Sequence, residues 1–426
     1  MAINTNMDFR KKTKLEPEWI YNSRKSAWNS YNTHPLPDRV KHLWKYTRPE
    51  SFLIDDSDDI SSSSPRFISP DSPASFDSGN YAEQVIVSSD KDLDISLSAE
   101  YAAKEIVLCD LQSAYQEYPE LVKEHLGKLI GEDFGKFEAL NSAIWHNGVF
   151  LYVPDDLALT KPIMLMQLPS GVASFSRLLA VFGKNSRATV IDSMASAVES
   201  DGGLVNGITE LFADDYAQIR YVNLQNLHDS FKSYITQRAK IGRQSSIYSI
   251  FGGLGCSLSK VNAGTILAGK QAESRIYGVV FADNKQHFDY HTLHHHQTED
   301  SYSDIDFKVV LKDKATSAYT GLIKIDEATK NCQAYQINRN LILNKGPKAE
   351  SIPELEILTD EVQCSHGATM GPIDPEMLFY LKSRGLNEED AVRTIIEGFI
   401  EPTAAQLPDE LAETMRRMVI TKLEGN

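Results

Sequence analysis

The sequence predicts a mainly β fold with helical ends. Short runs rich in β-branched and aromatic residues recur about every 10–15 residues after residue 148, separated by Gly, Asn and Asp. Helical periodicity appears before and after this region but not within it. Such a long series of short strands without a helix indicates a sandwich, a barrel or a β-solenoid. No strict sequence period decides among these three.

Composition restricts the class of protein. The chain has 426 residues, 42% of them apolar and 24% charged, which is enough for two or three domains around a large core. Its net charge of −16 argues against nucleic-acid binding, because phosphate contacts need clustered Lys and Arg. The basic N-terminus has no apolar segment behind it, and no run of 18 apolar residues occurs, so we expect no secretion and no membrane span.

The cysteines point to a reducing compartment. Four of them are spread widely, without a CxxC pair, so they form neither a disulfide framework nor a self-contained metal site. We therefore expect a cytoplasmic protein. The four are Cys109, Cys256, Cys332 and Cys364.

Residues 1–54 are predicted to form an N-terminal helical segment. Pro17 begins a helical pattern over 16–31 that places Ile20 and Trp28 on one side. A proline-punctuated connection with the run WKYT follows. Residues 55–80, rich in Ser, Asp and Pro, are too polar to bury a core, and we interpret them as a disordered or mobile linker.

Residues 81–144 are predicted to form a mixed α/β region. The runs EQVIV and EIVLC have strand character. Helical patterns follow over Leu111–Tyr118, Pro119–Leu129 and Phe134–Trp145, with Asp110 as a cap for the first of them.

Strands dominate residues 145–369. Alternation is regular in DIDFKVVL, where Ile305, Phe307 and Val309 alternate with Asp306 and Lys308. This pattern predicts that one face of the sheet is core and that the other faces solvent.

The chain returns to helices over residues 370–426. Asp374 caps the first helix, Gly385 ends it, and Asn387 caps the next. The last helix carries an apolar side with Met415, Met418 and Val419, which we expect an isolated chain to leave unburied and available for docking.

One motif imitates a nucleotide site. Residues 264–270, GTILAGK, match the first seven positions of a phosphate-binding loop. The eighth position is Gln271, which lacks the hydroxyl that binds magnesium, and a strand-like run follows instead of a helix. We interpret the motif as a turn and expect this chain to bind no nucleotide.

Five histidines lie close together in HFDYHTLHHHQTED, namely His287, His291, His294, His295 and His296. Imidazoles are common metal ligands, so a metal site is one interpretation. On a strand His294 and His296 share one face while His291 and His295 share the other, so no three converge. The favoured interpretation is a histidine row on a solvated or interfacial sheet face.

The best candidates for chemistry lie at a strand-to-helix corner. Val362, Cys364 and His366 are two apart in an extended run, so they share one face, with the thiol and imidazole about 6–7 Å apart. From the spacing alone, one Cys and one His on a strand face are most often a buried packing residue and a hydrogen-bonded core histidine, so the spacing by itself favours packing over chemistry.

The run CSHGATMGPIDPEMLFYLKSRGLNEEDA, with PELEI before it and IIEGF after it, resembles the C-terminal signature of the SufB/SufD family of iron–sulfur cluster assembly proteins. The run WKYT is similar to part of the family's N-terminal segment. This resemblance implies a central right-handed parallel β-helix over about residues 145–369, flanked by helical ends.

The resemblance also implies partners and site residues. SufB supplies an essential cysteine and an acid near its interface with SufD, whereas SufD supplies the histidine of its CSHGA segment. Here Asn338 stands at the position of the SufB cysteine and Gly367 at that of the acid, which favours a SufD-like subunit with Cys364 and His366 at the assembly site.

On this interpretation the chain is a non-catalytic scaffold with a transient iron–sulfur cluster shared with a SufB-like subunit. The C-terminal helices would dock a SufC-like ATPase of the ATP-binding-cassette type. A cysteine desulfurase system and apo iron–sulfur proteins would be indirect partners. The residues expected to dock the ATPase are Met377, Tyr380, Arg384, Ile395 and Phe399.

Two other classes of protein fit the residues. A β-solenoid enzyme would use paired carboxylates or the Cys364/His366 thiol and imidazole, but same-strand spacing holds those two groups apart. A pure interaction protein would use only exposed strand edges and amphipathic helices.

Overall fold

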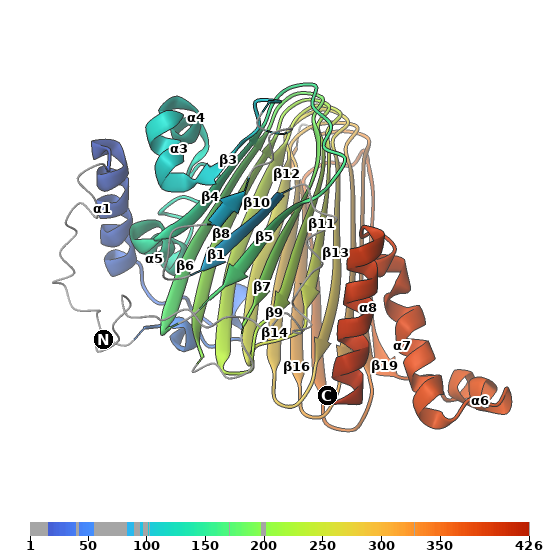
Figure 1. Cartoon of the computed structure of the whole chain (residues 1–426). Coiled ribbons are helices and arrows are strands. Elements are labelled where there is room, and N and C mark those ends of the chain that lie inside the picture. The colour runs from blue at the N-terminus through green and yellow to red at the C-terminus, as the bar shows by residue number, and fades with distance from the viewer. Residues whose placement is uncertain are drawn as a thin grey trace.

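The computed structural model has a parallel β-solenoid as its body, with helices at both ends of the chain (Figure 1). It describes residues 16–39, 42–54, 83–88, 94–96, 101, 103–169, 171–196, 202–327 and 329–425. The mainly β prediction with helical ends is confirmed, and of the three candidate architectures the solenoid is the one formed. The right-handed sense of the coil and the division into five segments stay predictions, and the predicted linker at 55–80 lies outside the described residues.

Two sheets form the solenoid, and the chain alternates between them. Sheet A has ten strands and sheet B has nine. In sheet A, in spatial order, are β19 (Val362–Pro372), β17 (Cys332–Ile342), β15 (Tyr302–Leu311), β13 (Glu273–Ala282), β11 (Ser246–Gly253), β9 (Gln218–Asn226), β7 (Arg187–Ala195), β5 (Ile163–Leu168), β1 (Glu83–Ser88) and β2 (Asp94–Ser96). In sheet B are β18 (Lys348–Ile357), β16 (Thr316–Ile325), β14 (His287–His296), β12 (Leu258–Leu267), β10 (Phe231–Ile241), β8 (Gly203–Ala213), β6 (Ala173–Phe182), β4 (Asn147–Val153) and β3 (Val107–Asp110).

The core lies between the two sheets. Each coil stacks in register on the next, so that Ile276, Ile305 and Gln336 follow one another on neighbouring strands. One large apolar cluster fills most of this interior. Packing is tight enough that a Cβ on Gly278 would lie 2.3 Å from the Phe307 ring, so only glycine fits there.

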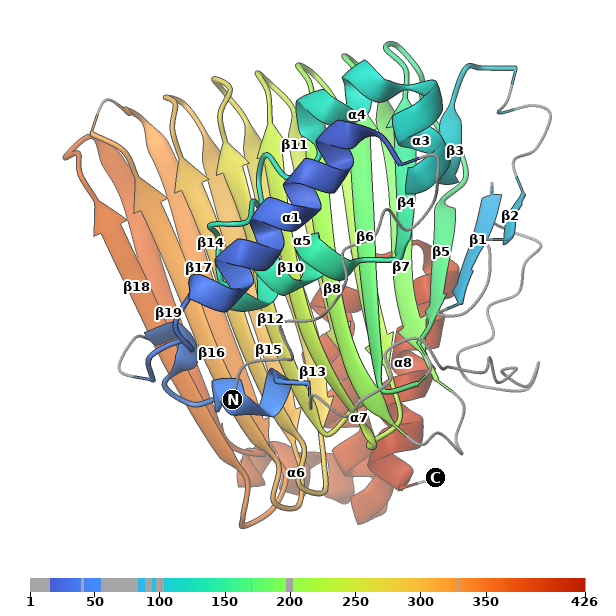
Figure 2. The ribbon, with the colours of Figure 1, turned by 90° about the vertical axis from the view of Figure 1, so that its left-hand side faces the viewer.

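The N-terminal helices cover the outer face of sheet B (Figure 2). Pro17 caps α1 (Glu18–Thr33), and Ile20 and Trp28 are buried as predicted. The Asp110 side chain accepts from the Ser113 backbone N–H, which confirms the predicted cap of α3. The other elements here are η1 (His42–Trp44), η2 (Pro49–Phe52), α3 (Leu111–Glu117), α4 (Pro119–His125) and α5 (Lys136–Ile144).

The WKYT segment is fixed to sheet B by a buried polar network. The Lys260 ammonium lies 2.8 Å from Asp289 and 4.8 Å from the Trp44 ring centroid. The Thr47 hydroxyl donates to Asp289, and His291 Nε2 lies 2.8 Å from the same carboxylate. Burial alone would raise the pKa of Asp289, but Lys260 and His291 hold it well below its usual value. This carboxylate therefore stays ionised beneath the segment.

The C-terminal helices α7 (Glu388–Ala404) and α8 (Asp409–Glu424) pack on the outer face of sheet A (Figure 1). Met415, Met418 and Val419 are buried there against strands such as β9 and β11, with Met415 and Val419 fully buried. The expectation that this apolar side stays free was wrong, because the solenoid's own outer face is apolar and covers it.

The same helices correct the predicted solvent face of DIDFKVVL. Ile305, Phe307 and Val309 face the core as predicted. Lys308 does not face solvent: its side chain is buried, and its ammonium lies 3.4 Å from Asp306. The reason is that α7 contacts the outer face of β15, so part of this face is shielded from solvent although it carries polar residues.

Helix α6 (Pro375–Ser383) differs from the other two because none of its residues is buried. It extends away from the solenoid beyond β19 (Figure 1). The predicted caps are confirmed: Asp374 accepts from the Glu376 N–H and Asn387 from the Asp390 N–H. None of the described helices combines the length and apolar character needed to cross a bilayer.

Candidate functional site

Strand β19, the last strand of sheet A, carries both predicted site residues. Val362 and Cys364 pack on a small cluster with Ile323 and Cys332, so this side of the strand faces the space between the sheets. His366 lies on the same side, as predicted, and is in register with Gln336 of β17. No further coil lies over β19 in the described structure, so His366 is exposed although it points toward the solenoid axis.

The Cys364 thiol is half-buried and held in its neutral form. Burial raises its pKa, and the neighbouring Cys332 thiol raises it further. Thiolates are the nucleophilic and metal-binding form of cysteine. Cys364 therefore needs a nearby cation or metal to become a ligand.

Sequence reasoning missed Cys332 as a neighbour of this site. It is fully buried one strand back, in register with Val362, and its Sγ lies 3.3 Å from Ser301 Oγ. The Cα atoms of a diagonal pair on neighbouring strands are about 8 Å apart, too far for a disulfide without backbone movement. The spacing of about one coil between Cys332 and Cys364 is the sequence signal that would have paired them.

Buried amides lie directly behind His366. Gln336, Asn338 and Asn340 line the interior side of β17, in register with His366, Ala368 and Met370. Asn338 donates to the Phe307 carbonyl at 3.1 Å. Gln336 Oε1 and Asn340 Oδ1 are buried without a hydrogen-bond partner in the described chain. The last coil is thus polar where the earlier coils are apolar.

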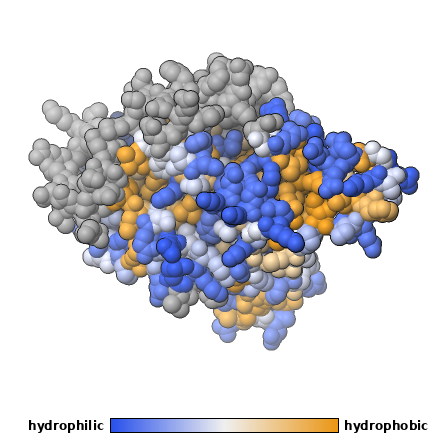
Figure 3. All heavy atoms as spheres, turned by 90° about the horizontal axis from the view of Figure 1, so that it is seen from below, coloured by the Kyte–Doolittle hydropathy of each residue, from blue (hydrophilic) through white to orange (hydrophobic). Residues whose placement is uncertain are grey.

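Exposed apolar side chains surround this end of the solenoid. Phe379 is 73% exposed, and the others lie on β18, β19, α6 and the turn after β18. Apolar surface is visible on the side where α6 lies (Figure 3). Such a patch is typical of a protein interface. The side chains are Leu355, Leu358, Met370, Met377, Phe379 and Tyr380.

The five predicted ATPase-docking residues divide into two groups. Met377, Tyr380 and Arg384 are exposed in or just after α6, with the Arg384 guanidinium 5.2 Å from the Tyr380 ring centroid. Ile395 and Phe399 are half-buried on α7, and Phe399 packs against the cluster under α8. Only the α6 group forms a free surface.

The histidines of β14 do not form a row on a solvated face. His294 and His296 are fully buried inside the solenoid, where His294 Nε2 lies 2.9 Å from Ser274 Oγ. His296 lies within 2.8 Å of both Ser301 and Ser303 hydroxyls. The favoured sequence interpretation was wrong for these two because it placed the alternating strand on the surface of a sheet instead of inside a coil.

The GTILAGK motif passes through β12 and a turn into β13, which confirms its interpretation as a turn. Lys270 pairs with Glu299 at 2.9 Å. Within the described chain, no three His, Cys, Asp or Glu side chains lie together in a way that could hold a metal ion. Cys364 and His366 therefore supply only part of a ligand set.

The described structure is thus a β-solenoid with helices on its faces, open at one end, where a thiol and an imidazole lie on one side of the terminal strand. Comparison with known families shows the class of this protein. Residues 165–399 match the model described as SUF system FeS cluster assembly, SufBD core domain, and residues 10–165 match the SufBD protein N-terminal region.

Full-length relatives carry the same description. The chain is 26% identical over 430 residues to an iron–sulfur cluster assembly SufBD family protein of Staphylococcus saprophyticus, covering 97% of this chain and 91% of that protein. A SufBD family protein of Staphylococcus aureus is also 26% identical over 430 residues, with the same coverage. The chain belongs to the SufBD family of iron–sulfur cluster assembly proteins.

Proposed function

We propose that this chain is a SufD-like, non-catalytic scaffold subunit of the cytoplasmic iron–sulfur cluster assembly complex. It pairs with a SufB-like subunit through the open end of its solenoid and holds part of a nascent cluster there. The observation that carries the proposal is the position of Cys364 and His366 on the terminal strand β19, beside exposed apolar surface.

The edge of β19 supports pairing with another chain. Its outer backbone N–H and C=O groups have no strand partner among the described residues, and such edges accept a further strand. The edge of β18 is less suitable because Pro353 lacks an N–H. Pairing along β19 would bring the partner's ligands next to His366.

The roles of the two donors differ. His366 is exposed and projects over the polar end of the solenoid, so it is the residue that ligates or orients the shared cluster. Cys364 is half-buried with a raised pKa and contributes less. Asn338 donates to a backbone carbonyl inside the core and offers no sulfur, so sulfur arrives through the SufB-like partner.

A SufC-like ATPase docks on helix α6 and its junction with α7. Support for this surface comes from Met377 and Tyr380, which are exposed by 51% and 54%. The buried apolar side of α8 takes no part. Cysteine desulfurase and apo iron–sulfur proteins then act on the assembled complex and not on this chain alone.

The decisive experiment is His366→Ala in the assembled complex, scored by iron and sulfide content. We expect cluster loading to fall strongly while complex recovery and thermal stability stay unchanged, because an exposed imidazole makes few core contacts. Gln363→Ala, exposed on the opposite side of β19, is the matched control. Normal loading would reject the site, and loss of the complex itself would make His366 a packing residue.

A truncation tests the ATPase surface separately. Removing residues 374–386 deletes α6 but keeps α7 and α8, which cover the solenoid. We expect ATPase binding to be lost and β content to be retained. Unchanged ATPase binding would contradict docking through α6 and leave the cluster site unaffected.

A further inference from the structure

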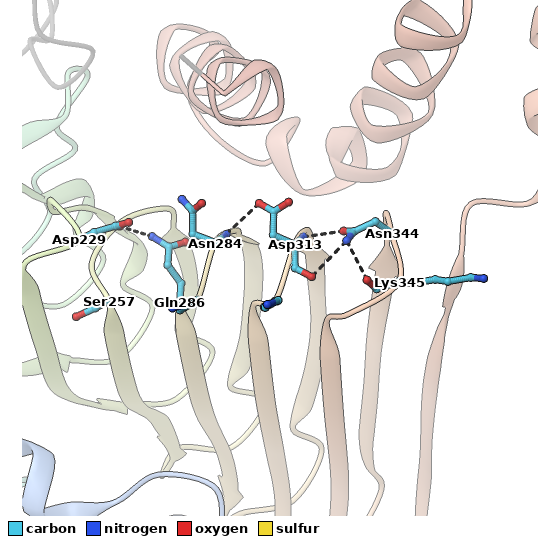
Figure 4. Close-up of a pocket in the computed structure, with 9 residues that line it drawn as sticks. Asp229, Ser257, Asn284, Gln286, Asp313, Asn344 and Lys345 are labelled. Atoms are coloured by element: carbon cyan, nitrogen blue, oxygen red, sulfur yellow. Dashed lines mark hydrogen bonds between the residues drawn. The ribbon is translucent and has the colours of Figure 1, made fainter.

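A ladder of polar turns joins sheet A to sheet B in the last three coils. Asn284, Asp313 and Asn344 occupy equivalent positions and stack on one another, as Figure 4 shows. The Asn284 N–H donates to Asp313 Oδ2 at 3.2 Å, and the Asp313 N–H donates to Asn344 Oδ1 at 2.7 Å. The turns are therefore held in register by their own side chains.

A lysine follows each of these ladder residues. Lys285, Lys314 and Lys345 are all exposed, and the Lys314 N–H donates to the Asn284 carbonyl, which fixes the same stacking for the lysines. Neighbouring coils are about 4.8 Å apart, so the three lysines leave the backbone at adjacent levels, and the Lys345 side chain is directed outward along the stack (Figure 4). Within the described part of the chain none of them has an ion-pair partner.

The turns on the opposite edge, from sheet B to sheet A, differ because their charged side chains form ion pairs between coils. There several charges meet an opposite charge on the next coil: Lys270 lies 2.9 Å from Glu299, and Lys330 lies 3.0 Å from Glu361. Like charges on adjacent strands are unfavourable. In a chain of net charge −16, three stacked unneutralised lysines thus need a reason other than folding.

The lysine turns line a shallow cleft of about 650 Å³ that is largely open to solvent. The end of α8 borders this region, because the Leu423 carbonyl accepts from Lys312. Two carboxylates also line the cleft: Asp229 accepts from Gln286, and Asp313 accepts from the Asn284 N–H, and both keep their negative charge beside the three lysines. The remaining lining groups are lysine ammoniums, amides and a serine hydroxyl.

We propose that this cleft, named here the lysine-turn cleft, binds a small polyanion that carries several consecutive phosphate groups. Lysine ammoniums act as point charges for phosphate, and a row of three matches a linear chain of charges better than a single phosphate. No aromatic side chain lines the cleft, so nothing stacks on a base. The site recognises the phosphate chain and not the nucleoside, so ATP would bind through its phosphates alone, which departs from the sequence expectation that this chain binds no nucleotide. This inference is independent of the proposed scaffold function.

The test is calorimetric titration of the full chain with inorganic triphosphate, ATP and adenosine at low ionic strength. We expect triphosphate and ATP to bind with affinities within about twofold of each other and adenosine not to bind. Binding should weaken as salt increases, since the contacts are exposed charges. A clear preference for ATP over triphosphate would overturn the proposal, because it would require contacts to the base.

Variants locate the binding site. Lys314→Gln, at the centre of the row, should weaken triphosphate binding about tenfold, which corresponds to loss of one charged contact. The triple change Lys285→Gln, Lys314→Gln and Lys345→Gln should abolish binding. Lys330→Gln is the matched control, because that lysine is equally exposed but belongs to the paired edge.

Three outcomes would reject the proposal. These are no triphosphate binding by the native chain, equal binding by the triple variant, and equal weakening by Lys330→Gln, which would indicate nonspecific charge attraction. Binding of a polyglutamate peptide without triphosphate binding would assign the lysines to an acidic protein partner instead. Circular dichroism melting verifies that the exposed substitutions leave the fold intact.

Discussion

Replacing Lys422 with methionine should release the C-terminal helices from the solenoid. The Lys422 ammonium enters the body of the protein at the end of α8, where it donates to the Leu254 and Phe281 carbonyls and to Gln286 Oε1. It also lies 3.4 Å from Asp283. One cation thus joins the last turn of α8 to the β11–β12 connection, to the end of β13 and to the β13–β14 connection.

The magnitude follows from the groups that lose this cation. Burial lowers the pKa of Lys422, which Asp283 partly offsets, so holding the charge there has a cost that the substitution removes. Against that, the Asp283 carboxylate and the Leu254 and Phe281 carbonyls lose this donor, whereas Gln286 Oε1 still accepts from the Asp283 N–H. Breaking such a buried pair costs about 3–5 kcal/mol. Since the side chain keeps 14% of its surface exposed, we expect a net loss near the lower limit, about 3 kcal/mol.

Hydrogen exchange and urea unfolding measure this loss. Amides of α7 and α8 should exchange on the order of 100-fold faster in Lys422→Met, while amides of β9–β15 change less. Arg417→Met, on the exposed side of α8, is the control and should stay within about 0.5 kcal/mol of the native protein, because Met, Lys and Arg have similar helix propensities. If both variants behave alike, the ammonium contacts do not hold the helix.

Three further outcomes are expected. Burial lowers the pKa of His296 to about 4 and lowers the pKa of His294 as well, so both imidazoles stay neutral in the folded protein at pH values where they are protonated in the unfolded chain. The contribution of His296 to the free energy of unfolding should be fully present above pH 6.5, and about 3 kcal/mol of it should be lost as the pH drops to about 4. Urea titration should show a smaller loss in His296→Gln. Met415→Ala should cost about 2–5 kcal/mol by leaving a cavity, whereas Met377→Ala on exposed α6 should cost less than about 0.5 kcal/mol in thermal unfolding. Asn387→Ala should cost about 1 kcal/mol and increase exchange in the first turn of α7, while unchanged exchange would mean that the cap contributes nothing.

Local sequence rules predicted the helices and strands well because caps and alternation depend on residues close together in the sequence. Caps such as Asp110, Asp374 and Asn387 act within three residues, and alternation is a property of one strand. The solenoid architecture could be predicted only from a sequence repeat as long as one coil. It is present in the turns: Gln271, Asp300 and Asn331 all have positive φ and are 29 and 31 residues apart, close to one coil. This period is irregular, so inspection of the strands did not reveal it.

The wrong predictions concerned which faces of helices and strands are covered by other parts of the fold. A local sequence pattern carries no information about this. An apolar stripe such as that of Met415 has the same pattern whether it docks on the chain's own sheet or on another protein. His294 and His296 likewise alternate as surface residues do, but serines of the facing sheet lie within hydrogen-bond distance of the Nε2 atom of each inside the coil. The pairing of Cys364 with His366 was predictable because i and i+2 on one strand always share a face. The proximity of Cys332 was missed, since it follows from the sequence only when the length of one coil is known.

The two ends of the solenoid limit how large an assembly can grow. At the N-terminal end, short strands β2 and β3 run antiparallel to their neighbours, and three- and four-residue strands offer little for another chain to extend. At the other end β18 and β19 present ten and eleven residues. Once two chains pair through their β19 ends, the described part of each chain has no second end with long edge strands to which a third chain could pair. In the pairing proposed above, association through β19 therefore stops at two solenoids and does not propagate into a fibre, although a stack of parallel coils has the repeat that fibres use.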